Sequence, residues 1–167
     1  MSDTVILARA SAADIPLLSN LLELYIHDMS ALFPHVELGA DGRFGYAKLP
    51  LYFSEPARRF AYLIRHGERV VGFALATRGS PVDEDPEVLD VAEFFVARGH
   101  RRKGVGARAA LLLWSSLRGR WTVRVVASNA SALEFWRGAI AELTQGTAVE
   151  ETRAGSAGDW QIFRFES

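Results

Sequence analysis

Residues 99–106, GHRRKGVG, place positive charge and glycine immediately before a segment with an apolar stripe. A helix that begins here would present unpaired backbone N–H groups and the positive end of its dipole to an anion. Gly104 and Gly106 would let phosphate oxygens approach the backbone, and the cations at 101–103 would add mobile positive charge. The turn therefore predicts a diphosphate site. The alternative is a strand-to-helix turn whose charges are solvated.

Glu93 is the second candidate for chemistry, because it interrupts the apolar run VLDVAEFFVA at residues 88–97. A carboxylate inside such a strand costs free energy unless it is paired or functional, and burial would raise its pKa towards the range of a general base. The structural alternatives are an ion pair with an arginine such as Arg124, or a place at an open sheet edge. Asp90 is a weaker candidate, interpreted as the solvated start of the strand.

The turn and the carboxylate need a strand followed by a helix, and the surrounding pattern predicts both. Residues 88–97 read as a central strand, and the apolar positions from Val105 onward recur at helical spacing. Further strands are expected at 4–10, in a hairpin over 58–79, at 121–128, and near 146–152 and 159–166, with further helices at 11–29 and 129–143. Ser11 and Asp14 form a candidate capping box. The order β-α-β-β-β-α-β-α-β-β predicts an α+β fold with a largely antiparallel sheet.

Composition narrows the class of protein. The chain has 167 residues, 49% of them hydrophobic, which predicts a single domain over residues 1–167. With no cysteine, disulfides, thiolate metal sites and a cysteine nucleophile are excluded. A net charge of −1 speaks against nucleic acid or an anionic membrane as partner, including RNA binding through RGHRRK at 98–103. We find no leader or membrane-length apolar stretch and expect a cytoplasmic protein. No metal is expected, since His27 and His35 lack a third ligand nearby.

Two motifs resemble those of one family. The run from Arg101 to Gly106 is similar to the R/Q-x-x-G-x-G/A signature of the GNAT superfamily, the acyl-CoA-dependent N-acyltransferases, and it also lies between an apolar strand and a helix. Asn129, Ala132 and Phe135 resemble the N-x-x-A-x-x-F pattern of the same family. The resemblance covers residues 88–143 well and implies a twisted, mostly antiparallel sheet of about seven strands with helices on both faces.

The resemblance also implies acetyl-CoA as co-substrate and suggests which residues hold it. The pantetheine arm would pair with β-strand backbone, the pyrophosphate would lie on amides of the glycine turn, and an asparagine would contact the pantetheine. The residues so placed are Phe95, Val96, Arg101, Arg102, Lys103, Gly104, Val105, Gly106, Ala107, Asn129 and Trp136. From its residue type alone, Asn129 is a helix N-cap. Many members have a tyrosine at the position of Trp136, and its hydroxyl can protonate the departing CoA thiolate. An indole N–H is a donor but not a practical acid, and the helical spacing of Trp136 favours packing against the sheet.

The expected function is transfer of an acetyl group from acetyl-CoA to a primary amine of a small molecule or peptide. Without cysteine there is no thioester-linked acyl-enzyme, so the amine would attack directly in a ternary complex, with Glu93 as the base. The alternative is a non-catalytic acyl-CoA sensor or interaction domain of the same fold. Residues that could shape the amine pocket are Tyr25, His27, Asp28, Phe33, His35, Glu37, Phe44, Tyr46, Tyr52 and Phe53. A homodimer is compatible with the resemblance.

Overall fold

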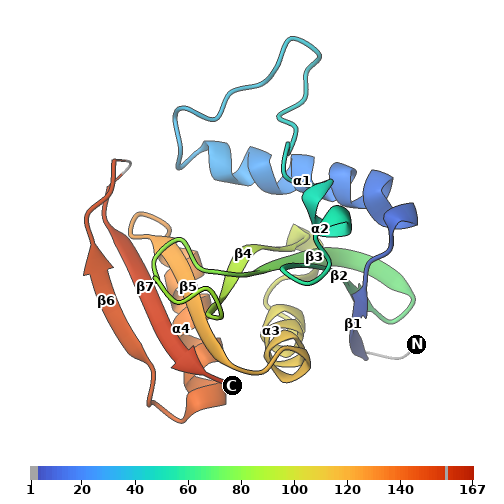
Figure 1. The fold of residues 1–167 in the computed structure, drawn as a ribbon. Helices are drawn as coiled ribbons and strands as arrows, with labels where there is room; N and C mark the ends of the chain where they lie inside the picture. Colours follow the sequence, from blue (N-terminus) through green and yellow to red (C-terminus); the bar gives the residue numbers. More distant parts are fainter. Residues whose placement is uncertain (1–3, 157) are drawn as a thin grey trace.

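A single seven-stranded sheet in the order β1-β2-β3-β4-β5-β7-β6 organises the computed structural model, which describes residues 4–156 and 158–167 (Figure 1). Only β4 and β5 pair in parallel, and the other neighbours are antiparallel. The strands are β1 (Val5–Arg9), β2 (Arg59–His66), β3 (Arg69–Arg78), β4 (Leu89–Val96), β5 (Arg120–Val126), β6 (Val149–Arg153) and β7 (Trp160–Glu166). The predicted fold class and element order are confirmed.

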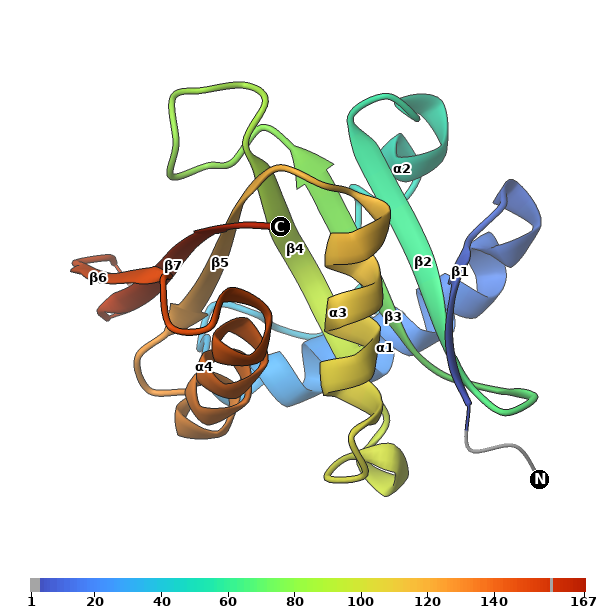
Figure 2. The same cartoon turned by 90° about the horizontal axis from the view of Figure 1, so that it is seen from below.

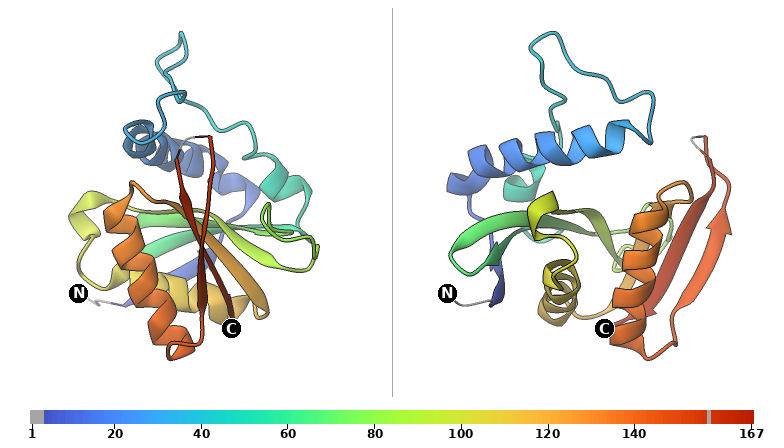
Figure 3. Two further views of the ribbon diagram at one scale, coloured as in Figure 1. Left: turned by 90° about the vertical axis from the view of Figure 1, so that its left-hand side faces the viewer. Right: turned by 180° about the vertical axis from the view of Figure 1, so that it is seen from behind.

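Helices cover both faces of this sheet, as predicted. The helices are α1 (Ile15–Ser30), α2 (Leu51–Ser54), α3 (Val105–Ser116) and α4 (Ala130–Thr144), with short 3-10 turns at Ala12–Asp14 and Arg98–His100. Figure 3 shows α1 and α2 on one face and α3 and α4 on the other. The backbone N–H of Ser11 donates to the carboxylate of Asp14 at 2.8 Å. The predicted capping box of Ser11 and Asp14 is present just before α1. None of the helices in the described ranges is long and apolar enough to cross a membrane.

Two apolar layers hold the helices to the sheet. On the face of α3 and α4, the side chains of Trp114, Leu113 and Trp121 are almost fully buried against the sheet. On the face of α1, Leu18 and Leu22 pack on the sheet from the opposite side. Since burial of each such side chain contributes about 1.5–3 kcal/mol, the two layers fix the position of the helices that flank the centre of the sheet.

The sheet opens at its parallel pair, and this opening positions the site. β4 and β5 pair only from Leu89 opposite Trp121 to Val91 opposite Val123, and they then diverge (Figure 2). On the other edge of β4, the register with β3 shifts so that Ala92 is an extra residue, a β-bulge. The carboxylate-bearing residue directly after the bulge, Glu93, therefore lies where the two strands part.

Candidate functional site

The carboxylate of Glu93 accepts two hydrogen bonds from tyrosines of distant segments. The hydroxyl of Tyr25 on α1 donates to Oε2 at 2.6 Å, and the hydroxyl of Tyr46, which precedes α2, donates to Oε1 at 3.1 Å. Sequence reasoning had named both tyrosines only as aromatic candidates for a pocket. Helical spacing could place Tyr25 on the buried face of α1, but it could not show what the hydroxyl touches.

Burial and hydrogen bonding act on Glu93 in opposite directions. Burial raises the pKa of its carboxyl, whereas the hydroxyls of Tyr25 and Tyr46 and the Arg124 guanidinium lower it. The effect of burial is larger, so the pKa of Glu93 lies above its usual value. The pKa values of Tyr25 and Tyr46 also rise, because both hydroxyls are buried and lie against the Glu93 carboxylate. Both tyrosines therefore stay protonated and act as donors, while Glu93 is a stronger base than a solvated glutamate.

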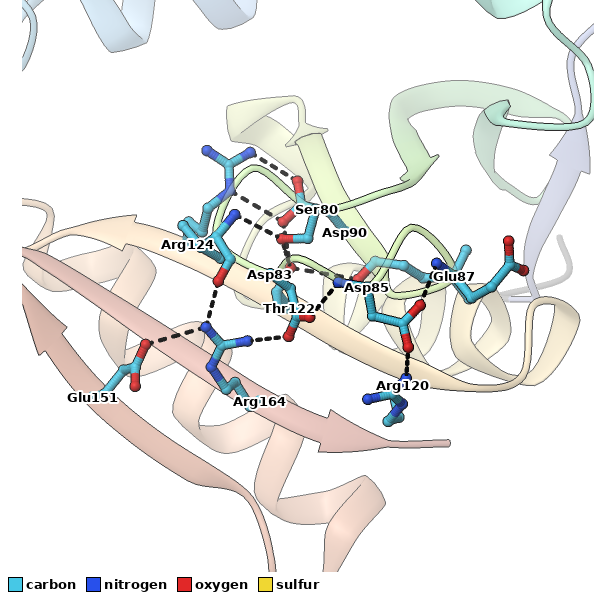
Figure 4. Close-up of polar contacts among 12 residues, drawn as sticks. Ser80, Asp83, Asp85, Glu87, Asp90, Arg120, Thr122, Arg124, Glu151 and Arg164 are labelled. Carbon is cyan, nitrogen blue, oxygen red and sulfur yellow. Dashed lines mark hydrogen bonds and ion pairs between the residues drawn. The ribbon is translucent and has the colours of Figure 1, made fainter.

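Arg124 pairs with Asp90 and not with Glu93. Its Nε lies 3.1 Å from Oδ1 of Asp90 and its Nη2 lies 2.8 Å from Oδ2 (Figure 4). The hydroxyl of Thr122 donates to the same carboxylate at 2.6 Å. Asp90 is only 1% exposed, so the expectation that it marks a solvated strand start is wrong. Asp90 is instead the buried anchor that orients Arg124 next to Glu93, and the ion pair considered for Glu93 does not form.

The loop between β3 and β4 is tied to the neighbouring strands by the same polar network. Ser80 and Thr122 share a buried hydrogen bond of 2.7 Å between their hydroxyls. Further along the loop, Asp83 pairs with Arg164 of β7 at 2.7 Å, and Asp85 pairs with Arg120 of β5 (Figure 4). These contacts connect the loop to β5 and β7 and hold it beside Arg124.

Two cavities meet at Glu93. The first, of about 410 Å³, lies between the β3–β4 loop and the segment around α2. The second, of about 480 Å³, follows the opening between β4 and β5 and reaches Asn129 and Trp136. The residues that line both are Tyr46, Ala92, Glu93 and Arg124. A group held in one cavity can therefore meet a group held in the other next to the Glu93 carboxylate.

The glycine turn forms the entrance to α3, as the sequence predicted. Gly104 is the N-cap of α3 with φ of +75°, and no atom lies within 4 Å of where its Cβ would be. This left-handed conformation favours glycine, and the space before the helix is open to an anion. The absence of a side chain at Gly106 serves helix packing. An added Cβ would lie 3.0 Å from the ring of Phe135, so glycine there allows α3 and α4 to pack closely.

Four further residues of the expected cofactor set, Arg102, Lys103, Val105 and Ala107, lie at this entrance. Arg102 adopts a left-handed φ of 58°, Lys103 is exposed beside it, and Ala107 lies in the first turn of α3. The side chain of Val105 is buried, 1% exposed, so only its backbone can contact a ligand. The side chain of Phe95 is also buried and packs edge-on against Tyr25. The carbonyl oxygen of Phe95 lies against Gly72 of the neighbouring strand β3, so the structure does not place this carbonyl at the open edge of β4.

Arg101 folds back on the protein. Its Nε donates to the carbonyl oxygen of Val96 at 2.6 Å, and its Nη2 lies 2.7 Å from Asp28 near the end of α1. Arg98 binds the same carboxylate at 2.6 Å. Asp28 therefore pairs with two arginines of the loop at once, so it is not free to attract the cation of an amine, the role suggested for it from the sequence. The pair links α1 to the glycine turn.

Asn129 and Trp136 close the second cavity from the side of α4. The Oδ1 of Asn129 accepts the backbone N–H of Ala132 at 3.2 Å, so the residue is the expected N-cap and its Nδ2 remains a donor. Trp136 is 7% exposed and packs edge-on against Phe94, with ring centroids 5.1 Å apart. Its position agrees with the packing role expected from its helical spacing.

Comparisons with known proteins identify the family of this chain. The model of the Acetyltransferase (GNAT) family matches residues 18–139, and the chain belongs to that family. No curated protein matches it. Among solved structures, an acetyltransferase from Thermus thermophilus is 20% identical, with 100% of both chains covered and a TM-score of 0.66. A ribosomal-protein-alanine N-acetyltransferase from Brucella melitensis is 16% identical over 97% of this chain and 99% of its own, with a TM-score of 0.69.

A third solved structure is an aminoglycoside acetyltransferase in complex with coenzyme A. It is 15% identical, covers 98% of this chain and 95% of its own, and has a TM-score of 0.67. At these identities the likeness establishes the fold. The family model over residues 18–139 confirms the expected assignment to the GNAT superfamily.

Proposed function

We propose that this chain is an N-acetyltransferase that moves the acetyl group of acetyl-CoA to a primary amine of a small molecule or peptide. The observation that carries the proposal is the place of Glu93, whose carboxylate borders two cavities at the point where β4 and β5 part. One cavity would hold the thioester and the other the amine. Direct attack in a ternary complex needs this meeting point and a base beside it.

The residues present fit the pantetheine and pyrophosphate of such a co-substrate. The backbone N–H of Ala97 donates to the carbonyl oxygen of Val71 in β3. The carbonyl of Val96 faces the opposite, open edge of β4, where it accepts a hydrogen bond from Nε of Arg101. The backbone of Val96 at this edge is proposed to receive the pantetheine, whereas the carbonyl of Phe95, which was expected to share this role, lies against Gly72 of β3. The amides from 101 to 107 at the start of α3 would hold the pyrophosphate, since a helix N-terminus favours negative charge. Asn129 would donate its free amide N–H, and Trp136 would wall the cleft.

Glu93 is proposed to act as the general base. When bound, acetyl-CoA supplies a thioester carbonyl as electrophile. The amine nitrogen forms a bond to the carbonyl carbon, the carbon–sulfur bond breaks, and the proton lost by nitrogen moves to Glu93. Tyr25 and Tyr46 hold the carboxylate in place through their hydroxyls. Water can protonate the departing thiolate, because a thiol with a pKa near 8.5 is a good leaving group and needs no side-chain acid.

One observation supports the second candidate, a non-catalytic acyl-CoA-binding domain. Both oxygens of Glu93 already accept a hydrogen bond, so the carboxylate could serve to fasten α1 to β4 without any proton transfer. Release of the free CoA thiol distinguishes the two functions.

The single domain over residues 1–167, the homodimer and the cytoplasmic location remain predictions.

The experiment is an acceptor panel with acetyl-CoA, read by appearance of free thiol and by mass of the product. Polyamines, aminoglycosides, amino acids and peptides are compared with a reaction that lacks acceptor. We expect acceptor-dependent thiol release and a product heavier by one acetyl group. If acetyl-CoA binds but no acceptor accelerates thiol release, the enzyme proposal is wrong and the binding-domain alternative stands.

A further inference from the structure

Positive charge gathers around the first cavity, on the side of Glu93 away from the opening between β4 and β5. Five cationic side chains line it against three carboxylates. The cations are Lys48, Arg58, Arg59, Arg78 and Arg124, and the carboxylates are those of Glu55, Asp90 and Glu93. The chain as a whole has a net charge of −1, so this accumulation is local. It sets the electrostatic potential that a bound acceptor meets.

The carboxylates of this cavity are already engaged. Glu55 pairs with Arg59 at 2.8 Å, Asp90 pairs with Arg124 at 2.8 Å, and Glu93 receives its two tyrosine hydroxyls. Arg78 pairs with Glu87, whose side chain is 66% exposed. Lys48 and Arg58 have no carboxylate within ion-pair distance among the residues that the structure describes.

Two further groups offer unused hydrogen-bond donors. The Tyr52 hydroxyl is buried and makes no hydrogen bond of standard geometry within the described chain, although the Tyr46 hydroxyl and the Arg59 guanidinium lie near enough to shift its pKa. Burial raises the pKa of Tyr52 to about 12, so its hydroxyl is protonated and can donate. Arg124 uses Nε and Nη2 on Asp90, and its Nη1 makes no hydrogen bond in the described part of the structure (Figure 4). A buried hydroxyl without a partner costs free energy that a bound acceptor atom would recover.

We propose that the acceptor amine also carries an anionic group, a carboxylate or a phosphate-type group, which binds the cations of the first cavity. This inference rests on the proposed function and specifies its substrate class. The amine lies at Glu93, and the anion meets Lys48 and Arg58, with Tyr52 and Arg124 as neutral and charged donors between them. A polycationic acceptor of similar size is disfavoured, because like charges repel at this short range.

A matched series of aliphatic amines separates the end group from the amine. The probes are 4-aminobutanoate and 3-aminopropylphosphonate as anions, 4-aminobutanamide and 1-aminobutane as neutral ends, and 1,4-diaminobutane as a cation. Binding to the full chain saturated with CoA is measured by saturation-transfer NMR at low salt, and thiol release is measured separately with acetyl-CoA. We expect both anionic probes to bind at least 10-fold more tightly than the diamine.

The two readouts keep the inference and the proposed function apart. Tighter binding of the carboxylate or of the phosphonate identifies which anion the cavity prefers. Equal or tighter binding of the diamine, or no binding of either anionic probe, would overturn the inference whatever the turnover. Binding of the anionic probes without thiol release from any acceptor would instead contradict the proposed enzyme activity and leave the anion site standing.

Charge removal tests the residues. Replacing Lys48→Ala together with Arg58→Ala is expected to weaken binding of the preferred anionic probe by about 10-fold while acetyl-CoA affinity stays unchanged. Arg118→Ala is the matched control, because Arg118 is exposed just after α3 and does not line the cavity. An equal loss in the Arg118 variant, or no loss in the double variant, would contradict the assignment.

Discussion

The hydroxyl of Tyr25 lies 2.6 Å from Oε2 of Glu93, and this contact joins the middle of α1 to the bulge of β4. The helix thus contributes directly to the electrostatic environment of the candidate base. Because the hydrogen bond favours the ionised carboxylate while burial disfavours it, the pKa of Glu93 depends on both elements holding their places.

Glu93→Gln removes the candidate base and keeps its shape. We expect turnover to fall by about 10²- to 10⁴-fold and the acidic limb of the pH–rate profile to disappear, with little change in acetyl-CoA affinity. Glu142→Gln on the exposed face of α4 is the matched control and should leave turnover unchanged. Ordinary activity in the Glu93 variant would reduce this residue to a structural role.

Tyr25→Phe removes a hydrogen bond that lowers the pKa of Glu93. The pKa of Glu93 should therefore rise further, and the acidic limb of the pH dependence of kcat/KM should move to higher pH. The measurement is a full pH–rate profile for both proteins. An unmoved limb with lower activity at every pH would mean that Tyr25 acts only through packing.

Gly104→Asp places a side chain and a negative charge at the N-terminus of α3. We expect acetyl-CoA to lose its stabilising effect on the melting temperature, which follows RT ln(1 + [L]/Kd) for a ligand that binds the folded state. Gly42→Asp is a matched control, because Gly42 also has φ of +75° and open space around it. Both variants should lose about 1 kcal/mol through backbone strain, and only the Gly104 variant should lose the acetyl-CoA shift.

Asp90→Ala leaves the Arg124 guanidinium without its buried partner. We expect a loss of about 3 kcal/mol in the free energy of unfolding, measured by urea denaturation, because removing one member of a buried ion pair leaves the other charge uncompensated. Glu87→Ala breaks an exposed ion pair with Arg78 and should cost less than about 1 kcal/mol. Similar losses in the two variants would contradict the anchoring role of Asp90.

Trp136→Phe tests whether the indole takes part in the chemistry. Because Trp136 packs on Phe94 and Trp114 in the core, we expect a loss of about 1–2 kcal/mol in stability and retention of most turnover. A drop in turnover beyond about 100-fold in a folded variant, roughly 2.7 kcal/mol, would show that the indole N–H stabilises the transition state.

The sequence was sufficient to predict the elements because their signals are local. The apolar run of β4, the periodic positions after Val105 and the hairpin around Gly67 depend on neighbouring residues, and each lies close to where it was expected. The glycine turn was predicted for the same reason, since Gly104 and the start of α3 adjoin in the chain. Element order then identified the fold class.

The partners of the acidic residues could not be predicted in this way. Asp90 was expected in solvent because its neighbours in sequence say nothing of Arg124 and Thr122, which approach from β5 only after the parallel pair has formed. Tyr46 lies in a segment without regular periodicity, so its contact with Glu93 has no local signal. Such contacts depend on register and loop path, which a single sequence does not specify.

Synthesis from the N-terminus leaves β5 half-paired until late. β5 is held to β4 only between Trp121 and Val123, whereas β7 covers its other edge from Arg120 to Val126. β7 leaves the ribosome only after α4 and β6, so the nascent chain carries an open strand edge throughout that interval. Open edges attract strands of other chains. Translational pausing before Trp160 should therefore promote aggregation or chaperone capture, whereas the β1–β4 half can pair completely by then.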